Sequence, residues 1–415
     1  MKISLGYGTG QQEVSIPDRN LQAVLMPRGT EKQEDEDILL RKALRHPIGT
    51  PKLRTLFRSG EKIAVVASDM TRPLPTSRIM PVLLEELTAG GARLEDITLI
   101  FGLGIHRYHT EAEKRKLAGE AVYERIRCVD SDPEDCILLG YTSRGTPVEI
   151  TREVASADRI VCLGNIEYHY FAGFSGGAKA ILPGTASRNA IQKNHSHMME
   201  PGAASGCLEG NPVREDIEEA AAMCKIAFIL NVVLDADKRI LWAAAGDTVQ
   251  AHRAGCRYVD SCCRRKLQSA ADIVIVSQGG APKDLNLYQM QKALNHAAYA
   301  VREGGIIIMA GYLGEGLGEP VFEQWMREAE EPKELVRKIT KNFCLGGHKA
   351  AAIGSVLEKA SIFLVSSLQE SLVREIFMHP FGSVQEALQA AFQIMGEEAS
   401  VVVMPAGGSI LPDLK

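Results

Sequence analysis

Residues 159–163 read Arg-Ile-Val-Cys-Leu, with four apolar side chains in a row, and Gly164 follows directly. A short, continuous apolar run closed by a turn residue predicts a strand buried on both faces, which is typical of a parallel sheet. Further apolar runs that lead into turns rich in glycine or proline lie at residues 63–67, 97–101, 273–276, 305–309 and 362–365. The chain therefore carries a series of buried strands.

Segments with the apolar spacing of helices lie between these strands. They span residues 79–89, 110–117, 213–224, 285–301 and 332–341. Strands that alternate with helices predict an α/β fold with doubly wound, mixed or parallel sheets and flanking helices.

The length of 415 residues exceeds that of one typical domain and suits two. The charged triplet Arg264-Arg265-Lys266 precedes the 273–276 strand and is a candidate hinge. We expect an N-terminal catalytic and cofactor-binding domain at 1–266 and a Rossmann-like domain at 267–395. The last predicted strand, 400–404, is expected to return to the first domain, so that residues 396–415 complete it. The active site would lie in the cleft between the two domains.

Composition narrows the class of protein. The net charge of −5 offers no basic face for a nucleic acid, although a local cluster of arginine and lysine could still bind a small anion. The first residues resemble no signal peptide, and no apolar run reaches the roughly 18 residues of a membrane span, so we expect a cytoplasmic protein without a membrane partner. The nine cysteines are scattered and form no C-x-x-C pair, which disfavours disulfides or structural zinc.

Four loops should carry the site, because ligands of α/β sheets bind at the carboxyl ends of strands. These loops are residues 69–73, 102–107, 164–179 and 278–280. In the first, Asp69-Met70-Thr71-Arg72-Pro73, the Arg72 guanidinium can grip a carboxylate and Thr71 can bind a phosphate oxygen. The alternative is a plain turn closed by Asp69 and Pro73.

The second loop contains His106 and Arg107, with His109 nearby. A histidine just beyond a glycine-rich strand end is well placed to transfer a proton. A solvated loop histidine is the alternative, and His106 alone would not exclude it.

The third loop leads into the most informative stretch, residues 169–184, which read HYFAGFSGGAKAILPG. Its glycines and Ser175 offer backbone N–H groups to an anion such as phosphate. The spacing fits neither a P-loop nor a dinucleotide fingerprint. Lys179 is a candidate phosphate ligand or covalent attachment point, or a surface lysine on a glycine-rich turn.

Two more groups lie outside these loops. In Asn194-His195-Ser196-His197, both histidines could bind a metal if the segment were extended, whereas on a helix they would diverge. In 288–292, Gln289 and Lys292 are three residues apart, share one face of a helix and could grip a small anion or a hydroxyl. A solvated helix face is the alternative.

Taken together, the five groups resemble the nickel-pincer nucleotide-dependent lactate racemase family. The resemblance runs along the whole chain, from Tyr7-Gly8 and Ile16-Pro17 through Asn211-Pro212 to 347–350, and is sharpest at 169–184, His195 and 288–292. Several motifs in one order are far more specific than any one of them.

The resemblance implies roles for individual residues. The segment Asp69, Met70, Thr71 and Arg72 would contact the pincer nucleotide, with Arg72 also near the substrate carboxylate. His106 and His169 would be the two catalytic bases. Lys179 would carry the cofactor, a Ni(II)-pyridinium-3,5-bisthiocarboxylate mononucleotide, as a thioamide. His195 would be the protein ligand of nickel, and Gln289 and Lys292 would bind the substrate.

It also implies the reaction: racemisation or epimerisation of a small 2-hydroxy acid through a 2-keto acid. One histidine takes the hydroxyl proton while hydride passes to the cofactor, and the second histidine serves the opposite face. Cofactor-maturation proteins would be partners.

The substrate side group is not defined by these motifs; His109, Tyr108, Tyr168 and Tyr170 are candidates to line that part of the pocket. Two other functions stay open: a lyase or hydrolase using His195 and His197 with a divalent metal, and a non-catalytic carrier of nickel or cofactor.

Overall fold

The computed structural model describes residues 1–28, 34–235 and 237–414. The chain divides into two compact units. Unit 1 comprises Met1–Gly29 and Cys262–Lys415, and unit 2 comprises Thr30–Ser261. Each unit is an α/β structure built on its own six-stranded sheet, as the pattern of strands and helices predicts.

This division differs from the predicted domains, 1–266 with a return of 396–415 and 267–395. The predicted hinge 264–266 is part of a strand, β14 (Arg264–Leu267), which pairs with β20 (Leu411–Leu414). The predicted returning strand, β19 (Val401–Met404), lies between β15 (Ala271–Ser277) and β3 (Leu21–Val24). The first strands of the chain therefore belong with its C-terminal part, and unit 2 is inserted between them.

The main sheet of unit 2 has the order β13-β12-β9-β4-β5-β6. Only β13 is antiparallel to its neighbour. The strands are β4 (Ile63–Ser68), β5 (Ile97–Gly102), β6 (Arg127–Asp130), β9 (Arg159–Asn165), β12 (Ile226–Leu234) and β13 (Ile240–Gly246). Numbered along the chain, this order is 6-5-4-1-2-3, the doubly wound order of dinucleotide-binding folds. The alternation of strands and helices predicted a doubly wound sheet, but the Rossmann-like label was predicted only for 267–395.

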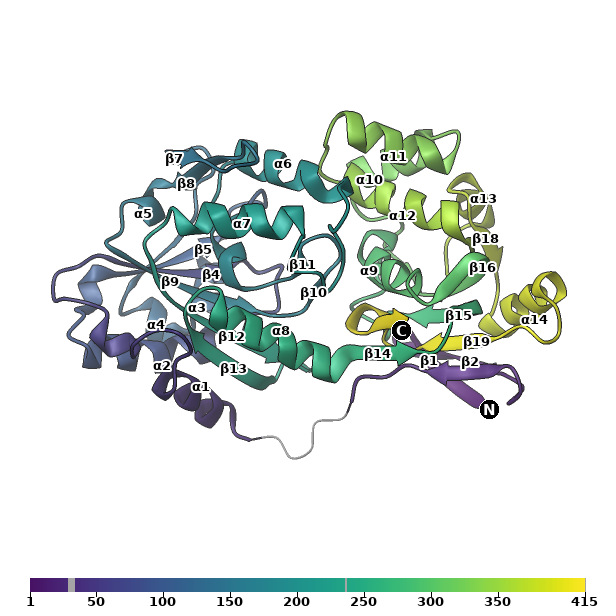
Figure 1. The fold of residues 1–415 in the computed structure, drawn as a ribbon, viewed down its shortest axis with the longest axis horizontal. Coiled ribbons are helices and arrows are strands. Elements are labelled where there is room, and N and C mark those ends of the chain that lie inside the picture. Colours follow the sequence, from purple (N-terminus) through teal and green to yellow (C-terminus); the bar gives the residue numbers. More distant parts are fainter. Residues whose placement is uncertain (29–33, 236, 415) are drawn as a thin grey trace. The chain divides into compact units, whose positions relative to one another are not determined.

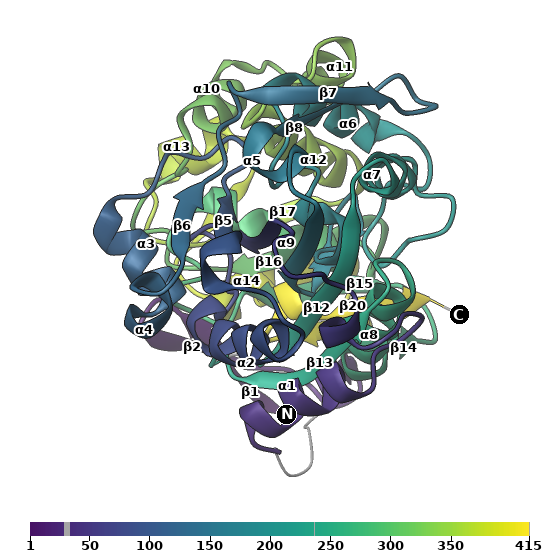
Figure 2. The same ribbon diagram turned by 90° about the vertical axis from the view of Figure 1, so that its left-hand side faces the viewer.

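Helices cover both faces of this sheet, with α1 and α2 on one side and α7 on the other (Figure 1). The helices of unit 2 are α1 (Glu36–Arg45), α2 (Thr76–Ala89), α3 (Glu111–Ala118), α4 (Glu120–Tyr123), α5 (Arg152–Ala155), α6 (Arg188–Ser196), α7 (Pro212–Ala222) and α8 (Gln250–Cys263), which crosses into unit 1. Two hairpins complete the unit: β7 (Cys136–Tyr141) with β8 (Pro147–Thr151), at the top of Figure 2, and β10 (Tyr168–His169) with β11 (Gly173–Phe174).

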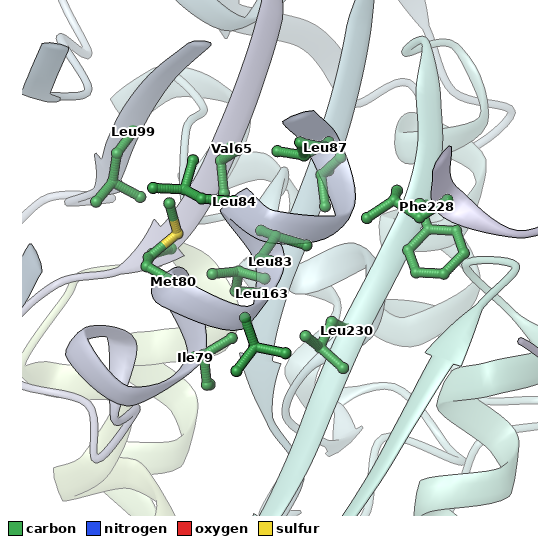
Figure 3. Close-up of a cluster of buried hydrophobic side chains, with 14 of the residues drawn as sticks. Val65, Ile79, Met80, Leu83, Leu84, Leu87, Leu99, Leu163, Phe228 and Leu230 are labelled. Atoms are coloured by element: carbon green, nitrogen blue, oxygen red, sulfur yellow. The ribbon is translucent and has the colours of Figure 1, made fainter. Parts of the chain in front are cut away.

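The core of unit 2 forms where α2 packs on the sheet. The side chains Ile79, Met80, Leu83 and Leu87 of this helix point at alternate strand residues such as Val65 (Figure 3). Both the helix spacing and the strand alternation follow from the positions of these apolar residues in the sequence. Burial on both faces keeps the central strands fixed, so their carboxyl ends hold the loops that follow them.

Unit 1 carries a fully parallel sheet with the order β18-β17-β16-β15-β19-β3. Its further strands are β16 (Val301–Ala310), β17 (Ser361–Val365) and β18 (His379–Phe381), and a separate hairpin pairs β1 (Lys2–Tyr7) with β2 (Gly10–Ser15). The helices are α9 (Leu287–Ala297), α10 (Pro320–Glu328), α11 (Pro332–Lys341), α12 (Gly347–Lys359), α13 (Glu370–Glu375) and α14 (Val384–Met395). This confirms the expected Rossmann-like arrangement.

A second hydrophobic core belongs to unit 1. It joins the sheet residues Ile273, Ile308 and Val403 to Leu388 of α14 and to Leu5 of the β1–β2 hairpin. None of the helices in the described parts of the chain is long and apolar enough to cross a membrane.

Candidate active site

The candidate site of unit 2 lies where the strand order of its sheet reverses, between β4 and β9. From β4 the chain moves through α2 to β5 on one side, whereas β9, the parallel neighbour of β4, leads through α7 to β12 on the other. Where two crossovers diverge, the loops after the strands leave an opening in which ligands bind. The predicted loops 69–73, 102–107 and 164–179 all follow strands at this edge. The fourth, 278–280, follows β15 and belongs to unit 1.

The loops after β4 and β5 are joined by a chain of hydrogen bonds. The buried carboxylate of Asp69 lies 2.5 Å from His106 Nδ1. Thr71 Oγ1 donates to Asp69 Oδ1 at 2.9 Å, and Arg72 Nη1 donates to Thr71 Oγ1 at 3.1 Å. The predicted base His106 and the predicted nucleotide-contacting segment 69–72 therefore belong to one hydrogen-bonded network.

Asp69 is an anion in this setting. Burial alone would raise the pKa of its carboxyl group, but the hydrogen bond and charge of His106, the Arg72 guanidinium and the Thr71 hydroxyl together lower it. A carboxylate on one ring nitrogen orients an imidazole and stabilises its protonated form, as a proton-transferring histidine requires.

His109 is buried beside the loop that follows β4. It is 8% exposed, its Nδ1 lies 2.6 Å from Asp130 Oδ1, and its Nε2 accepts a hydrogen bond from the Met70 backbone N–H at 3.1 Å. His109 therefore holds the Asp69–Arg72 segment in place through the Met70 backbone N–H. Tyr168 is also buried and donates to Asp260 Oδ1 at 2.7 Å. That His109, Tyr108, Tyr168 and Tyr170 line the substrate pocket stays a prediction.

The stretch after β9 folds into the β10–β11 hairpin and a 3₁₀ turn, η3 (Gly177–Ala180). Two buried side chains that the motifs did not reveal secure it. Asn231 Oδ1 accepts from Gly177 N at 2.7 Å, and Arg214 donates through Nε to Ala172 O at 3.1 Å and through Nη2 to Phe174 O. Both lie far from the loop in sequence, on β12 and α7, so local spacing carried no signal for them.

The ring of Phe171 brings three predicted residues together. Lys179 Nζ lies 5.7 Å from the centre of this ring. The ring centroids of His169 and His195 lie 4.5 Å and 5.0 Å from it, both edge-on. The predicted second base, attachment lysine and metal ligand therefore surround one aromatic side chain, which no sequence motif singled out.

The surroundings of Lys179 disfavour its charged form. Burial lowers its pKa well below the ordinary value, and the positive charges of Arg214 and Arg72 lower it further. Because the charge of Arg72 contributes to the pKa shift of Lys179, the Asp69–Arg72 segment and the residues around Phe171 influence each other electrostatically. A neutral amine is the nucleophilic form that acylation or thioacylation requires.

His195 lies on α6 and is 7% exposed, with Nδ1 at 3.0 Å from Asn194 Oδ1. His197 lies beyond the end of α6 in a 3₁₀ turn, and its Nδ1 contacts Glu200. The segment is thus helical and the extended arrangement that would aim both histidines at one metal is not formed. Within the described ranges, no cluster of three or more His, Cys, Asp or Glu side chains is arranged to hold a metal ion.

Gln289 and Lys292 belong to unit 1, on the first turns of α9. This helix follows β15, and β15 is the strand from which the sheet of unit 1 extends in both directions, towards β16 and towards β19. Asn286 caps the helix by accepting from Gln289 N at 3.0 Å. Lys349 of α12 donates to Tyr288 O at 2.7 Å and so fixes the same turn.

An imidazole that is hydrogen-bonded to a carboxylate, a lysine of lowered pKa and a second imidazole lie at a switch point of the sheet. Such a set of groups is typical of an α/β enzyme with acid–base and nucleophilic residues. Family models agree: the lactate racemase N-terminal domain matches residues 7–206, and the lactate racemase C-terminal domain matches 267–411. The chain belongs to the lactate racemase family, and the protein is an isomerase.

Individual relatives cover the whole chain. It is 34% identical to a lactate racemase of Thermoanaerobacterium thermosaccharolyticum over 99% of this chain and 98% of the relative. It is 33% identical to a lactate racemase of Lactiplantibacillus plantarum over 99% of both. The solved apoprotein of the T. thermosaccharolyticum enzyme superposes with a TM-score of 0.92 over 100% of both chains at 33% identity. A Thermotoga maritima protein at 20% identity shares the fold, with a TM-score of 0.68 over 93% of this chain and 100% of the other.

Proposed function

We propose that the protein interconverts the mirror forms of a small 2-hydroxy acid with a nickel-pincer nucleotide bound covalently to Lys179. The grouping of His169, Lys179 and His195 around Phe171 is the observation that supports this most. Lactate is the first substrate to test, because two relatives carry it in their names.

The residues present fit such a cofactor. The pKa of Lys179 is lowered well below that of an ordinary lysine, so the amine can be acylated. The Nδ1 contact of His195 leaves Nε2 as the lone-pair nitrogen, the form in which imidazole binds a metal. Thr71 and Arg72 offer a hydroxyl and a guanidinium to phosphate or carboxylate oxygens. When bound, the cofactor would supply the electrophilic acceptor for hydride that no amino-acid side chain provides.

The acid–base work would fall to His106 and His169. Each would remove the hydroxyl proton from one enantiomer and return it to the other. Asp69 would orient His106 and stabilise its charge after proton uptake. Arg72, Gln289 and Lys292 are proposed to hold the substrate carboxylate and hydroxyl while the Cα centre inverts.

The test is to produce the chain together with cofactor-maturation proteins and measure its intact mass and nickel content. We expect one adduct and one nickel per chain, with the adduct on the peptide that contains Lys179 and no adduct on Lys179→Arg. Unmodified Lys179 in nickel-loaded, active protein would refute covalent attachment.

Activity is then measured on single enantiomers of 2-hydroxy acids by loss of optical rotation. Deuterium placed at Cα should slow turnover and stay in the product, because hydride transfer retains the label whereas proton abstraction would exchange it with solvent. Complete washout of the label would contradict the proposed chemistry.

Two alternatives are separated by the same experiments. A lyase or hydrolase using His195 and His197 would be active with zinc or magnesium and an unmodified Lys179, and the helical placement of both histidines disfavours it. A non-catalytic carrier would hold nickel without turnover, and the Asp69 carboxylate beside His106, a contact that would serve proton transfer, argues against it. The cytoplasmic location stays a prediction.

A further inference from the structure

A buried polar network lies behind His195 in unit 2. Its centre is the fully buried carboxylate of Asp216 on α7. Oδ2 accepts from Thr146 Oγ1 at 2.7 Å and from Asn194 Nδ2 at 2.7 Å, and Oδ1 accepts from Thr142 Oγ1. A carboxylate is costly to bury unless several donors satisfy it, so these contacts fix its position.

The network determines which way the Asn194 amide faces. Asn194 is fully buried, and its Nδ2 donates to Asp216 Oδ2 and to the Val213 carbonyl oxygen at 3.2 Å. Both partners are acceptors only, so a flipped amide would set oxygen against oxygen. The Oδ1 atom is therefore the one that faces His195 Nδ1, at 3.0 Å.

An amide oxygen can only accept, so the proton of a neutral His195 ring lies on Nδ1 and the lone pair lies on Nε2. Free imidazole side chains in water favour the opposite tautomer. The hydrogen bond made by one ring nitrogen commonly decides which nitrogen is available to a metal. From this geometry we infer that Asn194 and Asp216 are positioning residues that hold His195 in its metal-binding tautomer.

The same network also links α6, α7 and the turn between β7 and β8, which would be a purely structural role. The tautomer of His195 separates the two roles, because packing alone would not fix it. It can be read in the apoprotein, whereas the identity of His195 as the nickel ligand rests on the proposed function.

The experiment uses the full-length apoprotein labelled with ¹⁵N at its histidines. Two-bond ¹⁵N–¹H correlation spectra give the protonated nitrogen of each ring, and His195→Gln assigns the signal. We expect the Nδ1–H form in the parent protein and in the control Asn189→Ala, which changes an exposed asparagine on the same helix. Asn194→Ala should convert His195 to the Nε2–H form while the other nine histidines keep their signals.

Removal of the carboxylate tests the role of Asp216. In Asp216→Leu, Asn194 Nδ2 loses one of its two acceptors, so the amide can flip. The signal of His195 should then move toward the Nε2–H form, while retained signals of the other histidines show that the variant is folded. A parent protein with the Nε2–H form, or an Asn194→Ala variant that keeps Nδ1–H, would overturn the inference for Asn194. A folded Asp216→Leu variant that keeps the full Nδ1–H form would overturn it for Asp216.

Nickel retention distinguishes failure of the inference from failure of the proposed function. In cofactor-loaded protein, Asn194→Ala should weaken nickel retention about 10- to 100-fold, the usual range for an outer partner of a metal ligand, with Asn189→Ala unchanged. If His195→Ala retains nickel as the parent does, the proposed ligand is wrong, although the tautomer result stands. If His195→Ala loses nickel and Asn194→Ala does not, the positioning role is refuted.

Discussion

The Asp69 carboxylate connects the loop after β4 to His106, the predicted base in the loop after β5. The family resemblance assigns Asp69 to cofactor contact, but in the structure its nearest ionisable partner is His106. Sequence motifs name such residues without saying which of them bond to each other. The pairing follows from the adjacency of β4 and β5, which the motif spacing does not contain.

Asp69→Asn is expected to lower kcat because the amide no longer stabilises a protonated His106. Loss of an orienting carboxylate costs on the order of 10- to 100-fold or more in rate. Asp237→Asn, at an exposed position of the same unit, should leave the rate unchanged. Steady-state kinetics on both enantiomers checks this, and equal rates for Asp69→Asn and the parent would contradict it.

Lys179 should react as a free amine at unusually low pH. Burial and two nearby arginines lower its pKa, so the midpoint of its deprotonation should lie well below pH 10.5. Labelling by a small amine-reactive reagent should show the same midpoint. Arg72→Gln removes one positive charge and should move that midpoint to higher pH. Peptide mass spectrometry of the apoprotein across pH gives both values. An unchanged midpoint in Arg72→Gln would show that the guanidinium does not act on Lys179.

At the scale of elements, the glycine-rich stretch depends on close backbone contacts. Gly173 has φ +75°, and a Cβ there would lie 1.9 Å from the Cys207 carbonyl oxygen. The sequence predicted a turn that exposes N–H groups to an anion. The packing of that turn against residues some thirty positions away depends on tertiary contacts and could not be predicted from it.

Gly173→Ala should therefore be more destabilising than Gly60→Ala. Gly60 has φ +87° but nothing within 4 Å of an added Cβ, so it carries only the backbone cost of about 1 kcal/mol. The contact at Gly173 should add a further few kcal/mol. Urea unfolding of the two variants gives the difference, and equal losses would mean that the loop relaxes around the new methyl group.

The strands and helices themselves were predictable. All six apolar runs lie in strands and all five helical segments contain a helix, because each pattern is local. The predicted segment 285–301 is too long, since α9 ends at Ala297 and Val301 begins β16. The predicted return of the last strand to the N-terminal domain was wrong, because strand pairing is not a local property of the sequence. Which sheet β19 joins depends on its pairing with β15 and β3, and a short apolar run fits either sheet.

At the scale of the whole molecule, each unit contains a histidine buried in neutral form. Burial lowers the pKa of His348 in unit 1 to about 3, and burial and the charges of Arg214 and Arg253 hold the pKa of His252 in unit 2 well below its usual range. Above pH 6.5 both histidines are neutral in the folded and the unfolded chain, so neither lowers the free energy of unfolding. As the pH falls below 6.5, the unfolded chain takes up protons that the folded units refuse, so stability falls.

Each such histidine should reduce the free energy of unfolding by about 1.4 kcal/mol per pH unit below 6.5. The two tryptophans report the units separately, with Trp325 in unit 1 and Trp242 in unit 2. Urea unfolding at several pH values in Trp242→Phe and Trp325→Phe backgrounds measures both slopes. His348→Gln should flatten the Trp325 slope alone, and a parallel change in the Trp242 slope would contradict independent titration.

The insertion of unit 2 has a consequence for biosynthesis. Strand β3 ends at Val24, but its partner β19 begins at Val401. At about 5–20 residues per second, β3 leaves the ribosome some tens of seconds before the strand it pairs with. Unit 2 has all of its strands by then and can fold first. During this time the backbone groups of β3 have no strand to pair with, and such a strand can pair with another chain. We therefore expect the yield of folded protein to depend on a nascent-chain chaperone that shields residues 21–24.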